Sequence, residues 1–490
     1  MWAKRSSTMP FAQACWGTAH CQGGRPGVER GMEQTIPHPQ AHSVTEHVRR
    51  TLVLGLPLIG SHLAQTAVGI VDTIMLGWYS IAALAASVLG STLFFTVFII
   101  GSGFSAAALP KVAAAQDDPQ RVRRITRMTL WLGVAFSLLT YPVFYFAEPL
   151  LLMLKQDAGV AAGAQEYLRI AGLGMVPAMI VAGLRSHLAG LERTAVVLWA
   201  TLGAAAVNAF LNWVLIFGNL GAPELGLAGA AYASLSVHTV MAIVLAIYAM
   251  RGPAMAQFQV FVRFWRADWP EAREIFALGW PISLTLLAES GLFMASGLII
   301  GTLGAVPLAA HGIALQITSA TFMIHLGLSA AVTVRAGTAY ARGDGAALRK
   351  VAQAGLILAS CVVALTVAAF FGMPGLLVRG FVDAADPAFP AILALGATLL
   401  MVAALFQVAD AAQVMALGLL RGVQDTRVPM VFAVIGYWVI GVLCSYVLGL
   451  PLGLGPAGVW LGLAIGLSVA GALMTRRFLR HPLLRAAQGS

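Results

Sequence analysis

Long apolar stretches separated by short polar segments make up most of this chain. None alternates polar and apolar positions as a half-buried strand does, and all are rich in Leu, Ala, Val and Gly, which favours helices. A helix needs about 20 apolar residues to cross a hydrocarbon core of about 30 Å. The pattern predicts an all-α integral membrane protein with twelve transmembrane helices. They cover about 50–76, 81–109, 126–147, 160–186, 195–218, 226–250, 273–301, 306–335, 351–374, 389–420, 428–449 and 455–477.

The composition supports this prediction and excludes an ordinary soluble protein. Of the 490 residues, 59% are hydrophobic and only 10% are charged, and the mean hydropathy is +0.83. The four cysteines (Cys15, Cys21, Cys361 and Cys444) lack the spacing of a metal site, and two of them lie in apolar stretches. A disulfide framework is therefore not expected.

The basic residues are unevenly divided between the two ends of these helices. With twelve spans, 23 of the 30 lysines and arginines fall on one side, and only Lys155, Arg169 and Arg379 fall on the other. Cytoplasmic loops carry an excess of Lys and Arg, so both termini are predicted to be cytoplasmic in a multi-pass protein of the plasma membrane, the inner membrane of a bacterium. The same bias explains the net charge of +10, and no nucleic-acid partner is expected.

The two halves of the chain repeat each other at an offset of 224 positions. Each half holds an even number of spans, so the repeats share one orientation and are expected to be two six-helix bundles related by a pseudo-two-fold axis along the membrane normal. The matching positions are Gly55–Pro57 with Gly279–Pro281, Gly77 with Gly301, and Gly103–Ser105 with Gly327–Ser329.

The repeat and the polar segments together divide the chain. Residues 1–45 lack an apolar run; they are expected to be disordered, or residues 1–31 are an artefactual extension before Met32, and the composition leaves both open. The segment between the halves mixes arginines with Phe and Trp, which is typical of an interfacial linker on the cytoplasmic leaflet. The predicted parts are an extension (1–45), an N-lobe bundle (46–250), a linker (251–272), a C-lobe bundle (273–480) and a tail (481–490).

Only three acidic residues fall well inside the predicted spans: Asp72, Glu289 and Asp410. No lysine or arginine accompanies them at that depth of the spans. An acid at mid-helix costs about 2.5–3.5 kcal/mol, whereas an interhelical hydrogen bond returns only about 0.6 kcal/mol on average, so a purely structural role does not explain them. A functional role is therefore favoured. The acids also break the repeat, because Asp72 corresponds to Ser296 and Glu289 corresponds to Gln65.

The first half offers further oxygen ligands near Asp72. Asn208 and Asn212 are four residues apart on the fifth span, so both amides lie on one helix face. With Asp72 they are a candidate Na⁺ site, or they tune the proton affinity of the carboxylate. A structural interpretation, in which the two asparagines only bridge helices, remains open. Gln65 and Ser234 are weaker candidates for the same lining.

In the second half, Glu289 lies near the middle of the seventh span and Asp410 near the middle of the tenth. An apolar cavity favours the neutral form of a carboxyl group, so such a group can take up a proton on one side of a membrane and release it on the other. The same carboxylate can attract a cationic substrate but cannot hold both, and this competition is the physical basis of antiport. His311 and His325 are interpreted as core or rim histidines rather than a proton relay.

Several motifs resemble those of one family, the MATE (multidrug and toxic compound extrusion) transporters, and in particular its NorM-like branch. They are Gln65–Gly77, Asn208–Trp213, Gly221–Gly226 and Asp410 through Asp425-Thr426. The resemblance extends from about residue 46 to 480. It implies a pair of six-helix bundles that exports cationic amphipathic drugs and toxic organic compounds in exchange for Na⁺ or H⁺. It also implies that Asp72, Asn208 and Asn212 form the first-lobe cation site.

For the second lobe, the resemblance implies that Glu289 and Asp410 are the functional acids, with Gln413 as a possible lining residue. Phe406, one turn before Asp410, departs from the pattern, because a tyrosine is expected there in NorM-like relatives. The missing hydroxyl weakens the case for a full cation cage in this lobe. No cofactor beyond the coupling ion is expected, and the chain is predicted to be a monomer whose partners are cationic small molecules and membrane lipids.

Three alternatives are less consistent with the sequence. An exporter of a lipid-linked precursor or another anionic metabolite should have arginines at mid-depth, and none is evident. An intramembrane enzyme should show a paired-acid metal motif, HExxH or a Ser/His pair at matched depth, and none is found, so the chain is not predicted to be an enzyme. A passive channel does not account for three separated acids.

Overall fold

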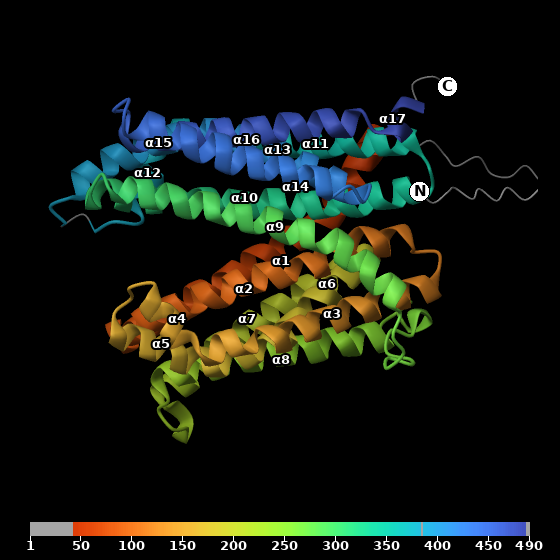
Figure 1. The fold of residues 1–490 in the computed structure, drawn as a ribbon, viewed down its shortest axis with the longest axis horizontal. Coiled ribbons are helices and arrows are strands. Elements are labelled where there is room, and N and C mark those ends of the chain that lie inside the picture. The colour runs from red at the N-terminus through yellow and green to blue at the C-terminus, as the bar shows by residue number, and fades with distance from the viewer. Residues whose placement is uncertain (1–42, 384–385, 487–490) are drawn as a thin grey trace, which may run out of the picture. The chain divides into compact units, whose positions relative to one another are not determined.

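The computed structural model of the protein describes residues 43–383 and 386–486, and within these ranges twelve helices are long and apolar enough to cross a membrane. The prediction of an all-α fold with twelve spans is confirmed (Figure 1). Most of the expected extension, 1–45, lies outside the described residues. Its end is placed differently, because α1 begins at Val44, where the Ser43 hydroxyl accepts a hydrogen bond from the Glu46 amide.

The first half contains six spans, and the fourth is interrupted by a short 3₁₀ segment. The elements are α1 (Val44–Tyr79), α2 (Ile81–Ala114), α3 (Pro119–Tyr145), α4 (Ala147–Met153), α5 (Ala158–Ala171), η1 (Gly172–Gly174), α6 (Met175–Gly190), α7 (Thr194–Phe217), η2 (Asn219–Gly221) and α8 (Gly226–Arg251). The fourth span is the continuous run of α5, η1 and α6.

The second half also contains six spans, and the eleventh has a π-helical middle. The elements are η3 (Ala256–Phe258), α9 (Trp269–Gly301), α10 (Ala305–Ala341), α11 (Gly345–Gly372), α12 (Pro374–Arg379), α13 (Phe389–Gly422), α14 (Arg427–Val434), η4 (Ile435–Val442), α15 (Leu443–Gly449), α16 (Gly455–Leu479) and α17 (Pro482–Ala486). The predicted tail thus includes the short helix α17.

The segment between the halves is shorter than the predicted 251–272. The helix α9 begins at Trp269 because Asp268 caps it, accepting a hydrogen bond from the Glu271 amide, and Pro270 follows in the first turn. Trp131 of α3 donates a hydrogen bond from its indole nitrogen to the Phe264 carbonyl oxygen at 3.1 Å. The segment is therefore packed against the first bundle by side-chain contacts.

Glycines of the internal repeat lie where the two bundles meet. A Cβ atom added at Gly103 of α2 would lie 2.6 Å from the Gly279 carbonyl oxygen of α9. At the matching position of the other half, a Cβ atom at Gly327 of α10 would lie 2.7 Å from the Ile59 amide nitrogen of α1. The same offset relates Gly279, which faces Phe104, to Gly55, which faces Leu328. The repeated glycines therefore allow the backbones of α2 and α9, and those of α1 and α10, to come into direct contact.

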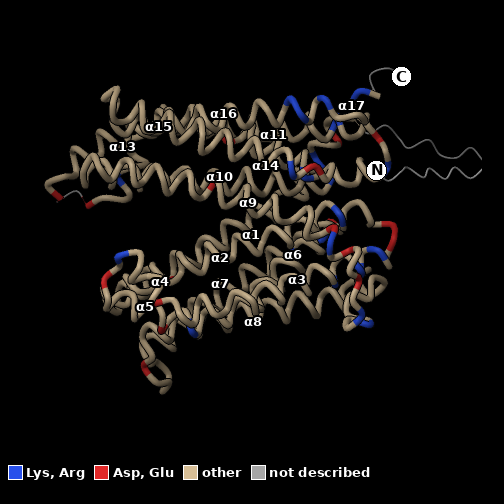
Figure 2. Tube along the Cα trace, in the orientation of Figure 1, with Lys and Arg blue, Asp and Glu red and all other residues tan. Residues whose placement is uncertain are grey.

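Most basic residues lie at one end of the helices, which we call the basic side (Figure 2). The ends of α1, α2, α9 and α10 nearest the glycine contacts lie there, so the bundles meet toward the basic side. An ion-pair cluster reinforces this contact. Lys111 of α2 is buried and pairs with Glu271 and, at 2.7 Å, with Glu274 of α9. Arg124 of α3 pairs with Asp268 at 2.7 Å.

Replacing Lys111 by glutamine is expected to destabilise the protein strongly. The change leaves Glu271 buried with only Arg124 as a more distant partner, at 3.8 Å, and breaking a buried pair costs about 3–5 kcal/mol. The control is Arg342→Gln, which removes the exposed pair with Asp117 and is expected to cost about 0–1 kcal/mol. Thermal unfolding in detergent measures both, and equal midpoints would show that the buried pair contributes little.

Candidate functional site

Asp72 lies on α1 with its side chain directed at α7. The Asn212 amide donates a hydrogen bond to the Asp72 carboxylate at 2.5 Å, and it also approaches the Asn208 side-chain oxygen at 3.3 Å. Both asparagines are fully buried. The Asn212 side-chain oxygen has no hydrogen-bond partner among the described residues. Carboxylate and amide oxygens are ligands that suit a hard cation such as Na⁺, and here the Asn212 amide nitrogen, not its oxygen, faces the carboxylate.

The other two first-half candidates have different surroundings. Ser234 of α8 lies beside the same carboxylate and lines the same cavity as Asp72. Gln65, two turns along α1, instead accepts a hydrogen bond from Arg185 at 2.9 Å, and Arg185 also reaches the Ser61 hydroxyl at 3.3 Å. Gln65 is therefore bound to an arginine of α6, and the structure does not bring it to the carboxylate of Asp72.

A cavity of about 730 Å³ lies beside Asp72 and is lined by residues of both bundles. Its walls come from α1, α2, α5 and α8 of the first half and from α9 and η4 of the second. Asp72 is its one acidic residue, and the described part of the chain contributes no lysine or arginine to its lining. The lining residues are Asp72, Ser91, Thr92, Phe94, Phe95, Thr96, Ile99, Tyr167, Ala171, Ser234, Leu235, His238, Leu287, Ser290, Gly291, Met294 and Trp438.

The position and chemistry of this cavity suit an amphipathic cation. Aromatic and apolar side chains form most of the wall, and such surfaces accommodate apolar ligand bodies of varied shape. A single carboxylate supplies the charge that attracts a cation. Asp72 lies seven residues from the end of α1 opposite the basic side. The cavity thus lies beyond the glycine contacts, in the half of the spans away from the basic side.

The second-half acids form a separate buried group. Glu289 of α9 and Asp410 of α13 are 8% and 0% exposed. The Glu289 Oε1 atom and both carboxylate oxygens of Asp410 have no hydrogen-bond partner within the part of the chain that the structure describes. The carboxyl groups of Glu289 and Asp410 are therefore less exposed than that of Asp72 and have fewer hydrogen-bond partners.

Phe406 and Gln413 lie on the same helix as Asp410 and are both buried. The Phe406 ring packs edge-on against Phe293 and Trp460, with ring centroids 6.0 and 5.4 Å apart. Phe406 therefore contributes apolar packing beside the acids. Neither amide atom of Gln413 has a partner among the described residues. Gln413 is thus a free polar group in the bundle interior.

The two histidines of α10 are buried, in keeping with the core interpretation. His311 accepts a hydrogen bond from the Trp460 indole nitrogen at 3.1 Å. His325 is fully buried, and neither ring nitrogen has a partner within the described ranges.

Two further polar residues of the second half were not among the sequence-based candidates. Arg421 lies in the last turn of α13, eleven residues beyond Asp410, and forms no ion pair among the described residues, so it is not a cation at the depth of the acids. Tyr437 of η4 is fully buried, and its hydroxyl has no hydrogen-bond partner among the described residues. It supplies a hydroxyl in this half, where Phe406 has none. In the sequence, Tyr437 is recognisable only as a residue with a hydroxyl group inside an apolar span.

A family model described as MatE matches residues 57–214 and 281–447. Among curated proteins, the chain is 45% identical over 436 residues to "Probable multidrug resistance protein NorM" of Rhizobium meliloti, covering 89% of this chain and 93% of the relative. It is 40% identical over 452 residues to a protein with the same description from Agrobacterium fabrum, covering 91% and 96%.

Solved structures share the fold at lower identity. One is the "Outward-facing conformation of a multidrug resistance MATE family transporter of the MOP superfamily", with a TM-score of 0.82, 19% identity and coverage of 91% of this chain and 97% of that one. Another is the eukaryotic MATE transporter AtDTX14, with a TM-score of 0.81, 15% identity and coverage of 91% and 98%. The chain belongs to the MatE family, and it is a multi-pass membrane transporter rather than an enzyme.

Proposed function

We propose that the protein exports cationic amphipathic drugs and other toxic organic compounds in exchange for Na⁺ or H⁺, by alternating access. One observation carries this proposal: the Asp72 carboxylate, held by Asn212 at 2.5 Å, lines a cavity whose walls come from both bundles. A movement of one bundle against the other would change access to that carboxylate. The relatives described as multidrug resistance proteins support the export of drugs.

Exchange follows from competition for a single charge. Asp72 is the one acid in the cavity lining, so a bound Na⁺ or proton removes the charge that would hold a cationic drug. A coupling ion that enters from outside thus displaces the drug outward. The ion would use the Asp72 carboxylate with the Asn208 and Asn212 side-chain oxygens.

The buried acids of the second half suit proton binding better than Na⁺ binding. Asp410 has no hydrogen-bond partner among the described residues, Glu289 is buried as well, and an apolar interior favours the neutral form of a carboxyl group. Tyr437 adds one buried hydroxyl to this half of the molecule. We therefore assign the proton-carrying role of this lobe to Glu289 and Asp410.

The basic side is proposed to face the cytoplasm of a bacterial inner membrane, with both termini on that side. The bundles meet toward the basic side, and the cavity lies away from it. Under this orientation the described conformation faces outward. The proposal predicts that a cysteine introduced into the cavity lining reacts with a membrane-impermeant thiol reagent added from the outside.

The decisive experiment is efflux of a fluorescent organic cation from vesicles that contain the purified protein, with Na⁺ and pH gradients imposed separately. Efflux is expected to rise above that of protein-free vesicles under at least one of the two gradients, and the responding gradient identifies the ion. Equal efflux with and without both gradients would rule out ion-coupled exchange.

Glu289→Gln and Asp410→Asn are expected to lower pH-driven efflux to near the level of protein-free vesicles, because an amide cannot take up and release a proton. Both changes conserve side-chain size. The matched control is Glu166→Gln, an exposed acid of α5, which is expected to behave as wild type. Full pH-driven efflux by both variants would remove these acids from the coupling mechanism.

An anionic or lipid-linked substrate is disfavoured by the charge of the cavity. Such a substrate needs cationic groups at its binding site. The cavity lining contains one carboxylate and, among the described residues, no lysine or arginine.

A further inference from the structure

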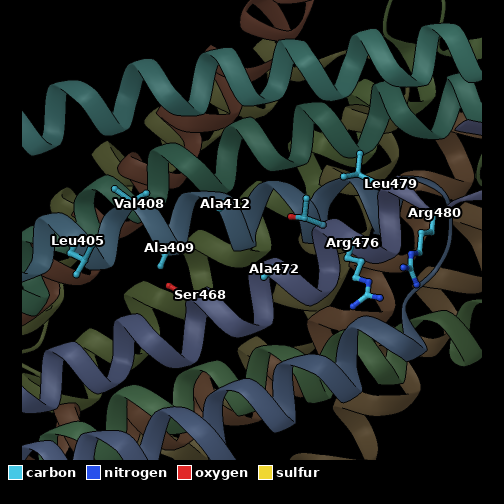
Figure 3. Close-up of a pocket in the computed structure, with 11 residues that line it drawn as sticks. Leu405, Val408, Ala409, Ala412, Ser468, Ala472, Arg476, Leu479 and Arg480 are labelled. Carbon is cyan, nitrogen blue, oxygen red and sulfur yellow. The ribbon is translucent and has the colours of Figure 1, made fainter. Parts of the chain in front are cut away.

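A groove on the outside of the second bundle has no part in the proposed transport site. It runs between α13 and α16 and has a volume of about 670 Å³. Figure 3 shows Leu405 toward one end, and Arg476 and Arg480 side by side toward the other. Most of the lining between these ends is apolar or small.

The groove exists because small residues face each other where the two helices pass. Ala409 and Ala412 lie on one face of α13, three residues apart, and Ala472 lies opposite on α16 with Gly471. Larger side chains at these positions would fill the space. The groove therefore has the elongated, apolar form that an acyl chain occupies.

The two arginines at one end of the groove differ from Arg477 in having no acidic partner among the described residues. Arg476 and Arg480 are four residues apart, so they lie on one helix face, and both are exposed. Neither forms an ion pair within the described ranges, whereas Arg477, on another face, binds Asp425 at 2.8 Å. Two guanidinium groups thus lie at the C-terminal end of α16 without a carboxylate partner among the described residues.

We propose that this groove binds a membrane phospholipid with an anionic headgroup. The acyl chain lies along Leu405, Ala409 and Ala472, and Arg476 and Arg480 bind the phosphate. A guanidinium matches phosphate geometry with two parallel hydrogen bonds, and basic pockets between spanning helices select anionic headgroups. The two features occur together here: an apolar channel for the chain and two arginines at one end of that channel.

A second apolar groove shows what the arginines add. It lies between α7 and α8, has a volume of about 470 Å³, and is lined by Val196, Trp199, Ala200, Gly203, Ala204, Val207, Val237, Val240, Met241 and Val244. No basic residue contributes to it among the residues that the structure describes. It is suited to an acyl chain of any lipid and offers nothing to an anionic headgroup.

The lipid would lie against a functional helix. The helix α13 carries Ala409 on its groove face and Asp410, fully buried, on its interior face. The groove residue Ala409 and the buried acid Asp410 are thus consecutive residues of one helix, about 100° apart around its axis.

The test compares binding of phosphatidylglycerol and phosphatidylcholine to the delipidated full-length protein by native mass spectrometry. The wild type is expected to retain phosphatidylglycerol at least tenfold better. The double variant Arg476→Gln, Arg480→Gln is expected to lose that preference while still binding phosphatidylcholine. The double variant Arg476→Lys, Arg480→Lys keeps the charge and should retain part of it.

Two further variants separate the groove from general charge. Arg251→Gln with Arg273→Gln removes two exposed arginines at other helix ends and is expected to leave the preference unchanged. Ala412→Phe fills the groove and is expected to weaken binding of phosphatidylglycerol with the arginines intact. Glycerol phosphate, which has no acyl chain, should not compete. An undiminished preference in the Arg476→Gln, Arg480→Gln variant, or an equal loss in the Arg251/Arg273 control, would overturn the proposal.

Discussion

Asp72→Asn is expected to reduce gradient-driven efflux of an organic cation to the level of protein-free vesicles. The amide keeps the size of the side chain and can still contact Asn212, so the fold should be preserved. It removes the one negative charge in the cavity lining, and with it the group for which drug and coupling ion compete. Vesicle efflux under the gradient that drives the wild type measures the effect.

The matched control is Asp117→Asn, an exposed acid on the basic side, whose contact with Arg342 is 3.7 Å long. This variant should transport as the wild type does, since exposed pairs contribute little. Drug binding to purified Asp72→Asn protein gives a second readout and should be weakened as well. Efflux at wild-type rates by Asp72→Asn would place the coupling charge elsewhere.

Gly103→Val is expected to reduce transport nearly as much as Asp72→Asn does, for a steric reason. An added side chain at Gly103 would enter the space of the Gly279 backbone and prevent α2 from approaching α9. Overpacking of this kind costs about 1–3 kcal/mol. Because the cost falls on the conformation in which the bundles meet at the basic side, it shifts the balance between the two access states by roughly 5- to 150-fold. Spin-label distances between the bundles and efflux rates are the two measurements.

Gly301→Val is the corresponding control. Gly301 is also a helical glycine of the repeat, but no atom outside its own helix neighbourhood lies within 4 Å of an added Cβ. The same substitution there should leave the distances and the transport rate close to wild type. If both variants reduced transport equally, loss of helical glycine rather than contact between the bundles would be the cause.

The spans were predictable because membrane insertion imposes one strong rule, an apolar stretch of sufficient length. The breaks within them were not: η1 interrupts the fourth span and η4 the eleventh. Such breaks depend on packing between helices, which leaves little trace in hydropathy. The start of α9 at Trp269 was also missed, although Asp268 and Pro270 carry a recognisable capping signal.

For the candidate site, helical spacing was informative and contacts between helices were not. The four-residue spacing of Asn208 and Asn212 predicted a shared face, and the structure brings that face to Asp72. The partner of Gln65, Arg185, lies 120 residues away in the sequence and could not be predicted from helical spacing. The burial of the Tyr437 hydroxyl in the second half likewise depends on how η4 packs against the helices around it.

The crossed glycine contacts have the symmetry of an isologous dimer interface, in which one surface is used twice. In a dimer of identical six-helix chains, every substitution would appear at both contacts and in both cavity walls. A fused chain encodes each half separately. It can therefore keep Gly103 and Gly327 at equivalent contacts and still place Asp72 in one half and Glu289 and Asp410 in the other. Fusion thus allows the chemistry of the two halves to diverge around a joint that remains symmetric.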